Sequence, residues 1–95
     1  MPTVAIDSPE AGTTVSPNFT ATGTVSGFTP PIPNPPPLTV HINIDGVKTW
    51  ATVTMNDSGG WTAVFTNVPT GARGTIKAVW TPTDESATVG PISVE

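Results

Sequence analysis

The stretch LTVHINIDGVKTWATVTMNDSGGWTAVF, from Leu38 to Phe65, decides the fold of this 95-residue chain. Apolar residues recur there at every second position, and the alternation is broken only at Asp45-Gly46 and between Asn56 and Gly60. A period of two is typical of strands with one buried face, and Asp-Gly is a strong signal for a hairpin turn. The stretch therefore predicts three antiparallel strands joined by two tight turns.

The two turns also predict how these strands pair. A two-residue turn at Asp45-Gly46 places His41 opposite Trp50, and both side chains are expected on the solvent face. The second turn keeps the apolar residues on one face only if Met55 opposes Trp61 across a five-residue loop. Trp61 is then a core residue.

The rest of the chain repeats this pattern in shorter segments. Twelve prolines and nine glycines leave almost no room for a helix. About seven short strands in a chain of this length are typical of an immunoglobulin-like sandwich. We therefore expect one all-β domain, residues 1–95: an immunoglobulin-like β-sandwich of about seven antiparallel strands with Greek-key topology and a Pro-rich loop, 26–37, after the second strand. The other four strands are expected at Thr3–Ile6, Asn18–Val25, Thr75–Thr81 and Ala87–Val94, with a bulge in the last at Gly90-Pro91.

Charge and composition narrow the classes of partner. The net charge is −4, with only three Lys and Arg residues, so the positive surface that neutralises a phosphate backbone is missing and nucleic acid is not expected as a partner. No apolar run approaches the roughly 20 residues of a membrane helix, so membrane insertion is not expected. Met1 leads directly into Pro2 and a strand without a signal segment, which favours a small complete gene product.

Five motifs follow one another along the chain: Ile6-Asp7-Ser8-Pro9 with Gly12, Phe19–Val25, Val40–Gly46, Asp57–Phe65 and Val68-Pro69-Thr70-Gly71. In order and spacing they resemble the bacterial and phage immunoglobulin-like domains. The resemblance covers almost the whole chain and implies a non-catalytic module of the kind found in secreted, surface and virion proteins. The family has no shared active site, so it implies no functional residues. The Pro-rich segment departs from the family pattern.

Catalysis is not expected at the sole histidine. A nucleophile relay would need a serine and a carboxylate gathered around His41, whereas a plain cross-strand pair with Trp50 accounts for its position. Paired carboxylates over a cleft, as in glycoside hydrolysis, have no counterpart in the sequence. We therefore expect that the protein is not an enzyme and uses no cofactor.

The acidic residues near turns could in principle supply oxygens to calcium. They lack the dense Asp-x-Asp spacing that fills six to eight coordination positions. Asp residues in turns are better explained by hydrogen bonds to their own backbone, so no metal site is expected. These residues are Asp45, Asp57, Asp84 and Glu85.

The expected interaction surface consists of Trp50 with its neighbour His41, together with the Pro-rich loop. An exposed tryptophan is a frequent energetic centre of protein contacts, and stiff proline segments lose little entropy on docking. In a second interpretation, Phe28, Ile32 and Leu38 fold back and close one end of the sandwich. Trp80, like Trp61, is expected in the core. The loop residues of the candidate surface are Phe28, Pro30, Pro31, Ile32, Pro33, Pro35, Pro36 and Pro37.

Three functions remain open. The first is a structural protein on a larger assembly, with a phage capsid or tail decoration on the virion surface as the leading case and capsid or tail subunits as partners. The second is a spacer or adhesion domain of a secreted or bacterial cell-surface protein, with neighbouring domains or a second copy as partners. The third is a carbohydrate-binding module that binds surface glycans through Trp50.

Overall fold

The computed structural model describes residues 3–28 and 36–95, and every regular element in them is a strand. Pro30, Pro31, Ile32, Pro33 and Pro35 lie outside the described residues. The chain is all-β, as the alternation of apolar residues predicts. The strands are β1 (Thr3–Ser8), β2 (Thr14–Val15), β3 (Phe19–Ser26), β4 (Leu38–Ile44), β5 (Val47–Trp50), β6 (Thr52–Met55), β7 (Gly60–Phe65), β8 (Gly71–Trp80) and β9 (Glu85–Val94).

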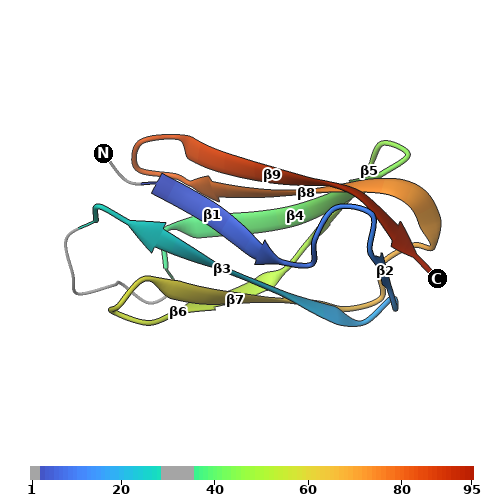
Figure 1. Cartoon of the computed structure of the whole chain (residues 1–95), viewed down its shortest axis with the longest axis horizontal. Coiled ribbons are helices and arrows are strands. Elements are labelled where there is room, and N and C mark those ends of the chain that lie inside the picture. The colour runs from blue at the N-terminus through green and yellow to red at the C-terminus, as the bar shows by residue number, and fades with distance from the viewer. Residues whose placement is uncertain (1–2, 29–35) are drawn as a thin grey trace.

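Two sheets pack face to face as a β-sandwich (Figure 1). The four-stranded sheet has the order β1-β3-β7-β6, and the five-stranded sheet has the order β2-β9-β8-β4-β5. Only β2 and β9 pair in parallel; the other described pairs are antiparallel. β1 begins and β9 ends at opposite ends of the long axis of the sandwich (Figure 1).

Residues 3–28 and 36–95 contain nine strands, where about seven are expected for the chain. The segment from Val47 to Met55 is not one strand: β5 pairs with β4 in one sheet, and β6 pairs with β7 in the other, with Ala51 between them. Both sheets face the same core, so the alternation continues unchanged through this crossing and does not reveal it. The short β2, which pairs with the end of β9, is the second addition.

Both predicted hairpin registers are confirmed. His41 pairs with Trp50, and Met55 pairs with Trp61. Asp45 and Gly46 have φ values of 51° and 85°, the positive values that a type I′ turn requires. In the second loop, the Asn56 side-chain oxygen accepts hydrogen bonds of 3.0 Å from the backbone N–H groups of both Ser58 and Gly60, which closes the turn.

The predicted bulge at Gly90-Pro91 is also confirmed. Ile76 pairs with Val89 and Gly74 pairs with Ile92, so two residues of β9 oppose the single Thr75 of β8. A second shift lies nearer the start of β8, where Ala72 and Arg73 oppose only Ser93. Arg73 has a positive φ of 66° there, and this second bulge has no counterpart in the predicted strands.

The core contains Trp61 and Trp80, as predicted, at 2% and 6% exposure. Phe65 is fully buried and stacks on Phe19 with ring centroids 4.6 Å apart. At the other end, half-buried Phe28 packs against Trp80 at 5.8 Å. Leu38 is buried as well, so Phe28 and Leu38 take the positions that the second interpretation of the Pro-rich segment gives them, whereas its third residue, Ile32, lies outside the described residues. The other buried apolar residues are Val4, Ala21, Val25, Val40, Ile42, Ile44, Ala63, Val68, Ile76, Ala78, Ile92 and Val94.

Candidate functional site

The outer face of the five-stranded sheet carries two cross-strand rows of polar side chains. Directly opposed residues in neighbouring strands lie about 5 Å apart, so the members of a row contact one another. The first row is Trp50, His41, Lys77 and Thr88, from β5, β4, β8 and β9 respectively. The second row, two residues further along β4, is Lys48, Asn43 and Thr75.

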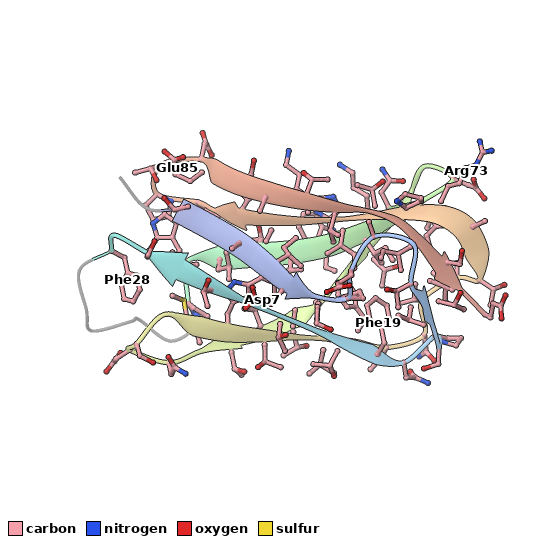
Figure 2. All side chains as sticks on the ribbon, in the orientation of Figure 1. Asp7, Phe19, Phe28, Arg73 and Glu85 are labelled. Atoms are coloured by element: carbon pink, nitrogen blue, oxygen red, sulfur yellow. The ribbon has the colours of Figure 1, made fainter. Side chains whose placement is uncertain are left out.

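The residues of these rows other than Trp50 line a hollow of about 510 Å³, which we call the basic hollow. It gathers all three Lys and Arg residues of the chain and its only histidine, although the chain as a whole carries a net charge of −4. Arg73 projects from this side of the sheet (Figure 2). The hollow is lined by His41, Asn43, Asp45, Lys48, Arg73, Thr75, Lys77 and Thr88.

The basic side chains of the basic hollow are not paired with acidic side chains of the described residues. Across residues 3–28 and 36–95, neither Lys48, Arg73 nor Lys77 forms an ion pair. All three side chains are exposed, and Asp45 is the one carboxylate in the lining. The positive potential of this face is therefore available to an anionic ligand.

His41 lies at the centre of the first row, and its surroundings correct one expectation. It is on the outer face, as its parity requires, but only 9% exposed instead of open to solvent. Trp50 covers it, with ring centroids 4.7 Å apart, while Trp50 itself is 59% exposed as predicted. Parity gives the face of a side chain, whereas burial also depends on the neighbours that lean over it.

Two features set the chemistry of His41. Its Nδ1 atom is buried and has no hydrogen-bond partner. Burial lowers the pKa of the imidazole below its usual 6.5, and the positive charges of Lys48 and Lys77 lower it further. His41 is therefore a neutral polar group at pH 7, surrounded by cations.

Asn43 supports the second row. Its side-chain oxygen accepts a 3.0 Å hydrogen bond from the backbone N–H of Gly46 and so ties the row to the hairpin turn. Since the oxygen is engaged, the amide NH₂ group is the part of Asn43 that a ligand can use, as a donor. A donor beside cations again suits a ligand with negatively charged or hydroxyl oxygens.

A second, apolar hollow of about 450 Å³ lies on the other side of Trp50, and we call it the edge groove. It exists because the chain leaves the five-stranded sheet at Ala51. From Leu38 to Val40, β4 continues to pair with β8, but its ladder with β5 stops at His41 and Trp50. The groove is lined by Pro36, Leu38, Thr39, Val40, Trp50, Ala51, Thr52 and Val53.

The predicted surface residues are thus brought together only in part. Trp50 contacts His41 and shares the edge groove with Pro36. Phe28 lies against Trp80 at the end of the core. The Pro37 carbonyl accepts hydrogen bonds from the backbone N–H and the hydroxyl of Thr81, at 3.0 and 3.2 Å, and so holds the segment against the end of β8.

Sequence reasoning missed the basic hollow. The pairing of Asn43 with Lys48 follows from the hairpin turn and could have been predicted from the sequence. The pairing of His41 with Lys77 is tertiary and joins residues far apart in the chain. The clustering of the basic residues therefore has only a partial signal in the sequence, namely that Lys48 and Lys77 both occupy outward positions of their strands.

Two of the four acidic residues expected near turns have the backbone conformation of tight turns. Asp45 and Asp84 have positive φ values of 51° and 58°, which Asp tolerates better than most residues. Among the described residues, no group of three or more His, Cys, Asp or Glu side chains could hold a metal ion. The described part of the chain also contains no helix long and apolar enough to cross a membrane.

No protein-family model, curated protein or solved structure matches this chain.

Proposed function

We propose that the chain is a non-catalytic module of the immunoglobulin-like type that attaches to a larger protein assembly, with a phage capsid or tail as the leading case. The strand order supports the type. If β1, β3, β4, β6, β7, β8 and β9 are taken as strands A to G, they give the immunoglobulin arrangement of A, B, E and D against G, F and C, and β5 takes the place of the added C′ strand. A Greek-key topology is part of this proposal.

The observation that carries the attachment is the edge groove with Trp50 on its rim. The lining is mainly apolar, and tryptophan is enriched among residues that dominate binding energy. The floor is the start of β4, where the ladder with β5 has ended: the Val40 carbonyl still accepts a 2.9 Å hydrogen bond from the Ala51 N–H, and Leu38 pairs only with β8. Extended segments of partner proteins bind to such open edges by adding a strand, with apolar side chains in the adjacent groove.

The test compares Trp50→Ala with Val64→Ala, which removes an exposed apolar side chain from the other sheet. The purified chain and both variants are mixed with purified virions and, separately, with cell envelopes of the source, and sedimentation measures retention. Retention on virions that is lost in Trp50→Ala and kept in Val64→Ala supports the proposal. A chain that stays monomeric in light scattering and is retained by neither particle refutes it.

Retention on cell envelopes alone would favour a spacer or adhesion domain of a secreted or cell-surface protein. Carbohydrate binding is the other candidate function, and a specific observation favours it: exposed Trp50 stands beside a hollow rich in hydrogen-bonding groups. Planar aromatic side chains provide apolar surface for the faces of sugar rings. The positive charges of the basic hollow narrow this candidate to sugars that carry negative charge.

A further inference from the structure

We propose that the basic hollow binds an acidic glycan, a sugar chain carrying carboxylate or sulfate groups, with the charged groups on Lys48 and Lys77 and a sugar ring beside Trp50. The proposal develops the carbohydrate-binding candidate and uses a surface different from the edge groove. The first observation that supports it is the uneven distribution of basic and acidic residues. Seven acidic residues are spread over the chain, while all three Lys and Arg residues line this one hollow without an internal ion pair.

The arrangement of polar groups favours a sugar over a simple anion. His41, nine-tenths buried, lies at the centre of the hollow; its Nδ1 atom is closed to solvent, so Nε2 is the ring nitrogen that a ligand can reach. A neutral imidazole nitrogen is either a donor or an acceptor, and a sugar hydroxyl can act as the complement of either. A small anion placed on His41 would meet a neutral group, whereas a sugar places hydroxyls there and its charges on the surrounding lysines.

The spacing of the cations also favours a ligand with sparse charge. Lys48 and Lys77 are separated by two strands and one row, so their Cα atoms lie about 12 Å apart by strand geometry. Nucleic acid duplexes carry one charge per roughly 1.7 Å, and three cations on an acidic protein neutralise little of that density. An acidic glycan carries its charges further apart, with neutral ring surface between them.

Trp50 completes the site from β5. It lies two residues from Lys48 on the same face of the strand and covers His41. More than half of its surface remains exposed, so the indole offers apolar area to a sugar ring placed between the two lysines. Asn43 and Thr75, which join Lys48 in the second row, add side-chain hydrogen-bonding groups for the hydroxyls.

The experiment measures binding of the full chain by calorimetry in low-salt buffer, because salt screens exposed charges. The probes are an oligogalacturonate, a heparin-derived hexasaccharide, neutral cellohexaose, sodium sulfate and a short single-stranded DNA. We expect at least one acidic oligosaccharide to bind ten or more times more tightly than cellohexaose, sulfate and DNA. Equal or tighter binding of sulfate would make the ligand a free anion, and tighter binding of DNA would make it a nucleic acid; either result overturns the proposal, as does no binding of either acidic oligosaccharide.

Two double variants separate the site from general charge. Lys48→Gln with Lys77→Gln removes two positive charges from the hollow, and Thr20→Glu with Thr54→Glu adds two negative charges to exposed positions of the other sheet. Both lower the net charge by the same two units. We expect the first to weaken binding at least tenfold and the second less than threefold. An equal loss in both overturns the proposal.

The sole histidine provides a second readout that does not depend on the variants. A carboxylate or sulfate bound in the hollow opposes Lys48 on β5, Lys77 on β8 and Arg73 at the bulge, and adds to the one negative charge of Asp45. It should therefore raise the pKa of His41, which NMR can follow without overlap from other histidines. An unchanged His41 titration at saturating oligosaccharide would place the ligand elsewhere and overturn the proposal.

Discussion

Replacing Gly23 by alanine is expected to destabilise the sandwich by about 2 kcal/mol. Gly23 is on β3, between Ile6 of β1 and Trp61 of β7. A Cβ atom there would overlap the backbone carbonyl oxygen of Ala5 and the indole ring of Trp61. Neither can yield easily, because the carbonyl belongs to a strand ladder and the indole is 2% exposed within the core.

The size of the effect follows from two opposing terms. Overpacking a filled core costs about 1–3 kcal/mol, and the upper end applies because one of the two clashes is with backbone. Alanine in a strand recovers about 0.5–1 kcal/mol of the conformational entropy that glycine loses on folding. The difference is about 2 kcal/mol, which in a domain of this size lowers the melting temperature by about 8–16 °C.

Urea unfolding followed by tryptophan fluorescence measures this difference, with circular dichroism melting as a second probe. Gly60→Ala is the matched control, since Gly60 is also a strand glycine but the nearest neighbour of its new Cβ would be the Asn56 side-chain amide, at 3.1 Å. We expect the control to stay within about 0.5 kcal/mol of the parent. A Gly23→Ala variant equally close to the parent, with an unchanged m value, would refute the packing described between β1, β3 and β7.

Three further outcomes are expected. Because the pKa of His41 is lowered below 6.5 in the folded state, the unfolded chain binds a proton at this histidine more readily than the folded chain does. The contribution of His41 to the free energy of unfolding should therefore be fully present above about pH 6.5 and be lost as the pH falls towards the pKa of the folded state. Urea unfolding of His41→Gln at a series of pH values should lack this pH dependence. Phe65→Ala should cost about 3–5 kcal/mol in denaturant unfolding, because Phe65 is fully buried against Phe19. Trp50→Ala should cost no more than about 1 kcal/mol by the same measurement, since Trp50 is mostly exposed and its contact is one cross-strand pair.

The hairpins could be predicted from sequence because their information is local. Asp45-Gly46 fixes the β4–β5 register, and the parity of Met55 and Trp61 fixes the β6–β7 register. Parity says which side of a sheet a residue occupies but not which sheet it belongs to. That is why the crossing at Ala51 was missed although the pairs on either side of it, His41 with Trp50 and Met55 with Trp61, were predicted correctly.

The burial of His41 and the clustering of basic residues on the outer face were harder to predict from the sequence. The His41 side chain was expected to be exposed because the outward-facing side chains of a sheet with one buried face usually contact solvent. In the structure, the large indole of Trp50 covers it, a contact that the register implies but whose extent depends on side-chain conformation. Arg73 reaches the hollow from a bulged segment of β8, and no alternation rule places a side chain there.

The crossing at Ala51 links the two proposed surfaces and decides how they can be tested. By leaving the five-stranded sheet, the chain opens the edge groove along β4 and makes Trp50 the last residue of β5, with one neighbour in the basic hollow and others in the groove. Trp50→Ala should therefore weaken both protein attachment and glycan binding. Lys48 and Lys77 line only the basic hollow and Val53 lines only the edge groove, so their variants report one surface each. If loss of the two lysines abolished retention on virions, the particle would be bound through the cationic face, and the edge groove would no longer be needed to explain attachment.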